Sequence, residues 1–268
     1  MKNELLHLGP FTIYGYGLMI AIGILAAFWV VDYRCKKYKL NSDTMFWMAV
    51  VAVVGGMLGA KILFYITRLD EIIKDPSVLL SVRSGWVVYG GIIGGVFACW
   101  LFCKIKGIRF SEYLDMAVPS VALAQAFGRL GCLMSGCCYG NETTSRFSLM
   151  FTDSDYAPNH VHLIPTQPIS AALNLAHFFI LLFVARKAKK HGQVTGAYLT
   201  LYSVGRFIIE FYRGDLERGQ VGSLSTSQFI AIFMFVFGAA VLYFGCEWMD
   251  TKKLKPETVS EETEDTKE

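Results

Sequence analysis

AVPSVALAQAFGRLGCLMSG (residues 117–136) and GAYLTLYSVGRFIIEFY (residues 196–212) are apolar stretches that each carry an arginine. A guanidinium group in hydrocarbon is costly and stays charged, so it usually faces a protein interior or a wet cavity. Arg129 and Arg206 lie in separate stretches and therefore indicate one shared site for an anion. Because the guanidinium is a planar fork of donors, it suits phosphate or carboxylate. These residues predict a membrane protein that handles an anionic molecule at the lipid boundary.

The composition agrees with a polytopic membrane protein. Of the 268 residues, 54% are hydrophobic and only 18% are charged, which is far from the average of soluble proteins. The formal net charge is +3, and the chain has no basic stripe with interleaved aromatic residues. We therefore expect no nucleic-acid partner.

The hydropathy pattern predicts an all-α fold with about seven transmembrane helices, since a bilayer core needs roughly 20 mostly apolar residues per helix. The predicted segments are approximately 11–31, 45–67, 86–104, 114–134, 168–186, 195–212 and 226–246. The fourth and sixth segments are the least hydrophobic and contain the arginines. Weaker hydropathy is expected of helices that line a polar cavity.

Basic loops predict the orientation. The runs at 32–39, 104–109, 185–190 and 251–255 follow the first, third, fifth and seventh segments. With seven spans all four lie on one side, which the positive-inside rule makes cytoplasmic. We therefore expect the N-terminus outside and the C-terminus in the cytoplasm. No cleavable signal peptide is evident at the N-terminus, so the first apolar run is interpreted as a retained span.

The domain prediction is simple. Residues 1–250 form one seven-span membrane domain, with a long outer loop at about 138–166. This loop is rich in turn residues, and its weak alternation fits a short hairpin or a partly ordered lid. Residues 251–268 form an acidic tail that we expect to be disordered and cytoplasmic.

The fourth segment carries several polar residues besides its arginine. Arg129 follows Gly128 near the outer end, where snorkelling to the interface is the alternative to a role in a site. Gln125 precedes Arg129 by one turn and is expected to hydrogen-bond within the bundle. Asp115 opens the segment and is a candidate N-terminal helix cap.

The sixth segment contains Tyr202, Arg206 and Glu210 at spacing i, i+4, i+8, so a helix places them along one face. An ion pair between Arg206 and Glu210 would reduce the cost of burying either charge. The pair can be purely structural, or Glu210 can orient Arg206 toward a ligand. We favour the second interpretation. Arg213 follows one turn later, and we expect it to belong to the same helix.

Glycines gather at 55–60, 89–95 and 128–140. In membrane helices, small residues let two backbones approach closely, and this interpretation is favoured for the first cluster. In the second and third clusters, glycine can also expose backbone N–H groups to a bound headgroup.

The seven cysteines include no CxxC pair and no Cys/His spacing typical of zinc, so we expect no metal site and no cofactor. Cys137 and Cys138 are adjacent, which disfavours a disulfide between them. Small apolar packing is one role for the cysteines. A disulfide from Cys132 to Cys137 or Cys138 stays open if this segment faces an oxidising space.

Five motifs together resemble the prolipoprotein diacylglyceryl transferase family. They are GYGLM at 15–19, WVVYGGIIGG at 86–95, the run from Asp115 to Gly140, IPTQP at 164–168, and YSVGRFIIEFYR at 202–213. The motifs match the family in order and spacing over nearly the whole chain. The specific parts are the Gly-Arg signature of the fourth segment and the Tyr-Arg-Glu-Arg series of the sixth helix, at residues 202, 206, 210 and 213.

The resemblance implies a reaction and its partners. Such enzymes transfer the diacylglyceryl group of phosphatidylglycerol to a lipobox cysteine in the signal peptide of a prolipoprotein, at the bacterial cytoplasmic membrane, and glycerol phosphate leaves. Carried over to this chain, Arg129 and Arg206 would hold the phosphate and stabilise its departing charge. The positions that would shape the headgroup site are Tyr16, Gly90, Gly140, Tyr202 and Glu210.

The chain departs from the family pattern at several positions. Tyr89 stands where the family has a histidine before the glycine pair, and a tyrosine of pKa about 10 is a poor general base at neutral pH. Cys132 and Cys137 replace an asparagine and a glutamate. The histidine and serine of the family's His-Pro-Ser-Gln are Ile164 and Thr166 here, and the Leu-Tyr-Glu that follows is residues 168–170, Pro-Ile-Ser.

Tyr89 is retained as a candidate catalytic residue, with two explanations left open. Either water deprotonates the acceptor thiol, helped by the positive field of the arginines, or the chain is a divergent member of the family with another acceptor. A protein that binds or transports anionic lipids is the alternative from another class. The absence of an internal repeat counts modestly against transport.

Overall fold

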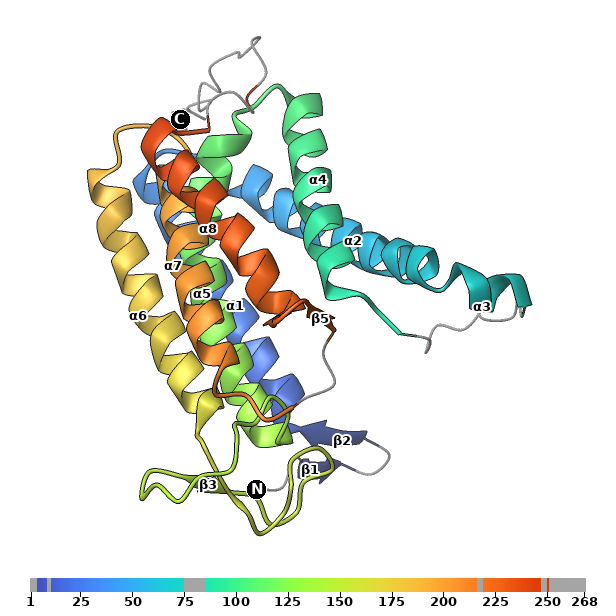
Figure 1. The fold of residues 1–268 in the computed structure, drawn as a ribbon. Coiled ribbons are helices and arrows are strands. Elements are labelled where there is room, and N and C mark those ends of the chain that lie inside the picture. The colour runs from blue at the N-terminus through green and yellow to red at the C-terminus, as the bar shows by residue number, and fades with distance from the viewer. Residues whose placement is uncertain (1–3, 9–10, 75–84, 216–218, 247–249, 251–268) are drawn as a thin grey trace. The chain divides into compact units, whose positions relative to one another are not determined.

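The computed structural model describes residues 4–8, 11–74, 85–215, 219–246 and 250. Seven long helices run through this part of the chain, and the short helix α3 follows the second of them (Figure 1). The helices are α1 (Gly15–Lys37), α2 (Ser42–Thr67), α3 (Leu69–Lys74), α4 (Val88–Lys106), α5 (Phe110–Ser135), α6 (Thr166–Lys187), α7 (Gln193–Glu210) and α8 (Thr226–Phe244).

The seven long helices correspond one for one to the predicted segments, which confirms an all-α polytopic membrane protein. Six of them, within the described ranges, are long and apolar enough to cross a membrane. Helix α7 is the exception because its polar residues, Arg206 and Glu210 among them, make its mean hydropathy too low. The orientation, with the N-terminus outside, stays a prediction.

Contacts divide the described chain into two compact units. Unit 1 contains the described residues of 1–34 and 114–247, and unit 2 contains those of 35–113 together with residue 250. The acidic tail predicted for residues 251–268, and the basic run at 251–255, lie outside the described residues.

Within unit 2, α2 and α4 pack through their glycines. A Cβ atom built on Gly59 would collide with the carbonyl oxygen of Gly90 and lie 2.8 Å from the Cα atom of Gly94. A Cβ atom on Gly94 would collide with the carbonyl oxygen of Gly55. The backbones are therefore in direct contact, which confirms the close packing predicted for the cluster at 55–60.

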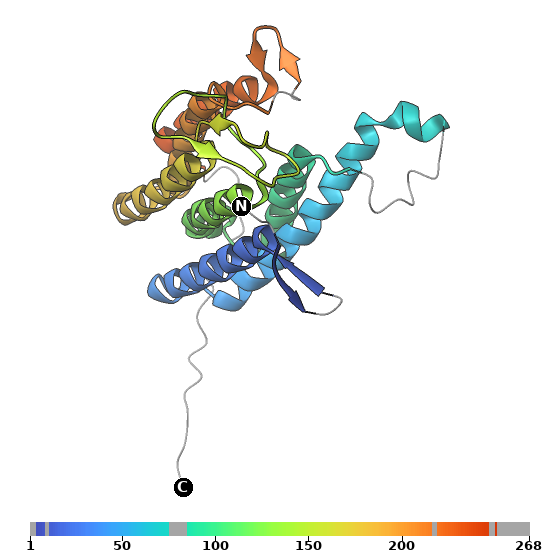
Figure 2. The ribbon, with the colours of Figure 1, turned by 90° about the horizontal axis from the view of Figure 1, so that it is seen from below.

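Within unit 1, α6, α7 and α8 lie side by side (Figures 1 and 2). A buried core joins α5, α6 and α7, and its members are Val118, Ala122, Leu123, Phe178, Leu181, Val194 and Ala197. Helices α7 and α8 approach closely, since a Cβ atom built on Gly238 would lie 2.8 Å from the backbone nitrogen of Thr200.

Two predicted polar residues tie α5 to α7. Gln125 Nε2 donates to the hydroxyl of Tyr198 at 2.8 Å, which confirms its hydrogen bond within the bundle. The carboxylate of Asp115 accepts from the backbone nitrogens of Gly192 and Thr195 at 2.7 and 2.8 Å, and from the Thr195 hydroxyl at 2.6 Å. Asp115 thus caps the N-terminus of α7 rather than that of its own helix.

Three short antiparallel hairpins flank the helices: β1 (Glu4–Leu8) with β2 (Phe11–Tyr14), β3 (Leu149–Met150) with β4 (His162–Leu163), and β5 (Gln220–Val221) with β6 (Leu224–Ser225). The first corrects a prediction, because residues 11–14 pair with β1 and the helix begins only at Gly15. Aromatic and β-branched residues in Phe11–Tyr14 favour the strand.

The hairpin β3–β4 is one of the two structures predicted between the fourth and fifth segments. Its loop folds over a small buried cluster of Phe151, Ala157 and Leu163, against which Leu133 of α5 packs. This packing fixes the loop to the end of α5, the helix that carries Arg129.

Candidate functional site

A cavity of about 690 Å³ opens in unit 1 between α6 and α7. Arg129 of α5 and Arg206 of α7 both line it, so the fold brings together the two arginines that the sequence assigned to one site. Most of the wall is apolar and includes Ile169, Leu173, Ile180, Leu201, Val204, Ile208 and Ile209. A long apolar wall with two guanidinium groups suits an amphiphile with an anionic headgroup.

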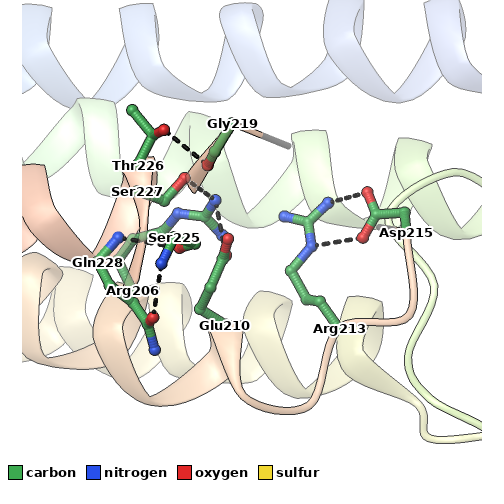
Figure 3. Close-up of polar contacts among 9 residues, drawn as sticks. All are labelled: Arg206, Glu210, Arg213, Asp215, Gly219, Ser225, Thr226, Ser227 and Gln228. Carbon is green, nitrogen blue, oxygen red and sulfur yellow. Dashed lines mark hydrogen bonds and ion pairs between the residues drawn. The ribbon is translucent and has the colours of Figure 1, made fainter. Parts of the chain in front are cut away.

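Arg206 is held by two neighbours. Its Nη2 atom lies 2.9 Å from Oε2 of Glu210 and donates to the Ser227 hydroxyl at 2.8 Å (Figure 3). The side chains of Arg206 and Glu210 are only 16% and 6% exposed, so this pair is shielded from water. The predicted i, i+4 ion pair is confirmed. Tyr202, one turn earlier on the same helix, also lines the cavity.

Ser227 is positioned by the start of α8. Ser225 and Gln228 form a capping box, in which the Ser225 hydroxyl accepts from the Gln228 nitrogen at 3.1 Å and the Ser225 nitrogen donates back to Gln228 Oε1 at 3.1 Å (Figure 3). The cap fixes the first turn of α8. Because Ser227 lies in that turn, the cap also fixes the hydroxyl that meets Arg206.

Arg129 lies where α5 crosses α1. A Cβ atom built on Gly131 would lie 3.2 Å from the Tyr16 ring, so the two helices are close here. The charge of Arg129 acts on Tyr16 and also on the thiol of Cys138. Tyr16 is 41% exposed and is near Arg129, and its role in binding a headgroup stays a prediction.

Each arginine follows a glycine that faces open space. A Cβ atom built on Gly128 or Gly205 would meet no atom within 4 Å. Gly205 itself lines the cavity. These glycines are therefore not needed for helix packing, and they leave room beside the guanidinium groups.

Gly140 has a packing role. A Cβ atom on Gly140 would collide with the carbonyl oxygen of Ile164 and lie 2.9 Å from Cγ2 of Thr166. Gly140 forms a β-bridge with Arg213, so it joins the chain after α5 to the chain after α7. Its predicted contact with a headgroup stays a prediction.

Arg213 corrects the predicted sixth helix. Helix α7 ends at Glu210, a turn follows at residues 211–212, and Arg213 lies beyond it in the β-bridge with Gly140. Its guanidinium is buried and makes a bidentate ion pair with Asp215, with Nε–Oδ1 and Nη2–Oδ2 distances of 2.9 and 2.6 Å (Figure 3). Its positive charge also acts on the thiol of Cys138.

Tyr89 and Gly90 belong to unit 2, in the first turn of α4. Gly90 is buried against α2, where a Cβ atom would lie 2.5 Å from Cβ of Leu63, so its observed contacts are those of helix packing. Tyr89 is 38% exposed. Their predicted roles at the site stay predictions.

One group of side chains can hold a metal ion within the described ranges. Cys132, Cys137 and Cys138 place their sulfur atoms within 4.8 Å of one another. Hydrogen bonds from Cys132 and Cys137 lower the pKa of the Cys138 thiol, and the charges of Arg213 and Arg129 act in the same direction. The spacing of these three cysteines matches no common zinc motif, so the group could not be predicted from the sequence.

The sequence model of prolipoprotein diacylglyceryl transferase matches residues 3–244. The chain belongs to this family. A phosphatidylglycerol–prolipoprotein diacylglyceryl transferase of Clostridium tetani is 48% identical over 241 residues, covering 90% of this chain and 96% of the relative. A second such enzyme, from Clostridium perfringens, is 43% identical and covers 86% of this chain and 90% of the relative. One from Dehalococcoides mccartyi is 32% identical, with coverage of 81% and 86%.

Membership of the family agrees with the multi-pass membrane helices. Sequence reasoning identified three of the cavity's lining residues, Arg129, Tyr202 and Arg206, but missed others. His177 lines it from α6, is 7% exposed, and stacks on Tyr198 with ring centroids 5.2 Å apart. Its place in the cavity wall could not be predicted, because it is a single histidine in an apolar helix. Ser227 had one available signal, the Ser-x-x-Gln capping pattern at 225–228.

The Arg206–Glu210 pair gives a testable prediction. We expect Glu210→Gln to lower kcat/KM for lipid transfer by about tenfold to 100-fold, because an interaction that orients a shielded guanidinium is lost. Combined with Arg206→Ala, the same change should have little further effect, since Glu210 acts through Arg206. A double-mutant cycle measures this coupling.

Glu142→Gln is the matched control, because Glu142 is an exposed acid in the loop and is outside the cavity lining. Full additivity of Glu210→Gln and Arg206→Ala would contradict the positioning role.

Proposed function

We infer that this protein transfers the diacylglyceryl group of phosphatidylglycerol to prolipoproteins, as its relatives are named to do. The observation that carries the inference is the cavity of about 690 Å³, in which two arginines from separate helices meet a long apolar wall. A phospholipid needs both parts, since its headgroup is anionic and its acyl chains are apolar.

In this proposal, the phosphate of phosphatidylglycerol binds between Arg129 and Arg206. The acyl chains lie along the apolar side chains of α6 and α7. When the bond between the glyceryl carbon and the phosphate oxygen breaks, negative charge collects on the departing glycerol phosphate. Fixed guanidinium groups in a shielded site stabilise that charge without reorganising. Glu210 and Ser227 hold Arg206 ready for it.

The acceptor is proposed to be the thiol of the lipobox cysteine in a prolipoprotein signal peptide, and the membrane is proposed to be the bacterial cytoplasmic membrane. Tyr16 and Tyr202 supply hydroxyl groups near the two arginines and are proposed to bind the headgroup. Gly140 is proposed to shape the site indirectly, through the close packing that it permits, and Gly90 stays a proposed headgroup position.

The direct test uses the purified full chain in vesicles that contain phosphatidylglycerol, with a lipobox peptide as acceptor. We expect a lipidated peptide and an equal amount of glycerol phosphate. Phosphatidylethanolamine as donor, and a peptide with serine in place of the lipobox cysteine, are the matched controls and should give no product. If wild type forms no product while a relative works under the same conditions, the proposed function is wrong.

Tyr89 gives a further prediction about thiol activation. We expect Tyr89→Phe to keep kcat within about threefold of wild type, because a phenol is ordinarily a poor general base at neutral pH. The pH dependence of kcat/KM should also keep its shape. A loss of 100-fold or more, with a changed pH profile, would instead assign proton transfer to the Tyr89 hydroxyl.

A further inference from the structure

Three thiols meet at the end of α5, beside the arginine site. The sulfur atoms of Cys132, Cys137 and Cys138 all lie within 4.8 Å of one another, and all three residues are partly buried. Sulfur atoms that share one tetrahedral zinc ion lie about 3.8 Å apart, given Zn–S bonds of about 2.3 Å. The observed group therefore needs only a small contraction to bind such an ion.

The backbone turns sharply to build this group. Directly after α5, Gly136 and Cys138 have φ angles of +77° and +59°. For a residue with a side chain, this left-handed conformation is unfavourable and persists only where the surroundings hold it. A Cβ atom on Gly136 would collide with Ser154, so the turn also has no room for a larger residue.

Buried side chains from α6 hold the turn in place. Gln167 Nε2 donates to the carbonyl oxygen of Cys137 at 3.0 Å, and the Thr166 hydroxyl donates to that of Cys138 at 2.9 Å. Thr166 and Gln167 are only 2% and 1% exposed. The Ser135 hydroxyl lies 3.1 Å from the Cys137 sulfur and donates to it. Such supporting hydrogen bonds around the ligands are typical of metal sites.

The charges nearby favour a thiolate site. The positive charges of Arg213 and Arg129 both act on the Cys138 thiol. A divalent ion with three thiolates carries a net charge of about −1, which these two cations offset. Tyr16 is close enough to interact electrostatically with all three cysteines and with Arg129. The cluster of three cysteines therefore adjoins the proposed phosphate site.

We propose that Cys132, Cys137 and Cys138 bind one zinc ion and leave its fourth position for the thiol of the acceptor, a role that rests on the proposed function. Three protein ligands with one open position are the pattern of catalytic zinc sites. A thiol bound to zinc is deprotonated. This site supplies the activation that Tyr89 is poorly suited to give.

The step balances without any oxidant or reductant. The acceptor thiol releases its proton to solvent as its sulfur binds the ion. A sulfur lone pair then forms the bond to the glyceryl carbon, and the bond from that carbon to the phosphate oxygen breaks. Its electron pair stays on the oxygen, and glycerol phosphate leaves as an anion. The product is an uncharged thioether, a weaker ligand for zinc than a thiolate, so it dissociates.

Metal binding is tested apart from activity. The full chain, purified under reducing conditions, is loaded with Zn²⁺ and dialysed, and its metal content is measured. Co²⁺ is titrated in a second sample, where sulfur-to-cobalt charge-transfer absorption reports thiolate ligands. We expect one ion per chain and a tetrahedral thiolate spectrum. Cys132→Ser, Cys137→Ser and Cys138→Ser should each weaken binding at least about tenfold.

Cys99→Ser is the matched control, because Cys99 is a buried cysteine in unit 2, outside the cluster. It should bind Zn²⁺ and Co²⁺ as wild type does. Wild type that binds no stoichiometric ion, or cluster variants that bind like wild type, would overturn the proposal. A disulfide among the three cysteines in protein purified anaerobically would also overturn it.

The transfer assay separates this inference from the proposed function. Removal of zinc by a chelator should abolish transfer, and added Zn²⁺ should restore it, in wild type and in Cys99→Ser alike. Transfer at full rate by metal-free protein would refute the role of zinc in binding the acceptor thiol and leave the proposed function intact. Stoichiometric zinc binding without transfer would refute the proposed function and the acceptor role of zinc, while the three-cysteine site would stand.

Discussion

Arg206→Ala is expected to lower kcat/KM for lipid transfer by about 100- to 1,000-fold, the loss typical of removing one fixed donor from a developing anion. Arg206 lines the cavity from α7 and is oriented by Glu210 and Ser227, so its donors are in place before the charge forms. Arg129→Ala should cause a loss of the same order, because Arg129 reaches the same cavity from α5. Steady-state transfer to a lipobox peptide measures both.

Lysine replacements and one control arginine sharpen this test. Arg206→Lys keeps the charge but loses the planar fork of donors, so we expect it to recover only part of the activity. Arg186→Ala removes an exposed arginine at the end of α6, outside the cavity, and should transfer like wild type. Either cavity variant with full activity in folded protein would refute the phosphate-binding assignment.

The helices could be predicted because a membrane imposes one local rule on them. An apolar run of about 20 residues has to be a helix, since no water satisfies its backbone groups. The rule failed at the ends of two segments: Phe11–Tyr14 forms a strand with Glu4–Leu8, and Arg213 lies beyond the end of α7. The i, i+4 spacing of Arg206 and Glu210 was equally local, so their ion pair could be predicted.

The rest of the site depends on contacts between distant segments. Ser227 reaches Arg206 across 21 residues, and Thr166 reaches the carbonyl of Cys138 across 28. The three thiols meet only because Gly136 and Cys138 reverse the chain, and their spacing resembles no zinc motif. Gly90 shows the opposite case, because its motif indicated a ligand whereas its observed contacts are with α2.

Gly94→Ala is expected to destabilise the protein by about 1–3 kcal/mol, the usual effect of overpacking, and to lower its Tm in detergent by several degrees. The added Cβ atom would collide with the carbonyl oxygen of Gly55 and lie 2.8 Å from Cα of Gly59. Backbone atoms cannot rotate away as a side chain can, so α2 and α4 must separate. Thermal unfolding followed by circular dichroism measures the change.

Gly17→Ala is the matched control, because it adds the same methyl group to a helical glycine of α1 that has no atom within 4 Å of the built Cβ. Since alanine favours the helix over glycine, this variant should be neutral or slightly stabilised. The difference between the two variants therefore isolates the α2–α4 contact from helix propensity. Equal Tm values would show that α2 and α4 do not depend on backbone contact at Gly94. A lower Tm in Gly94→Ala alone would show that the glycines after Tyr89 are required for the packing of α4 against α2.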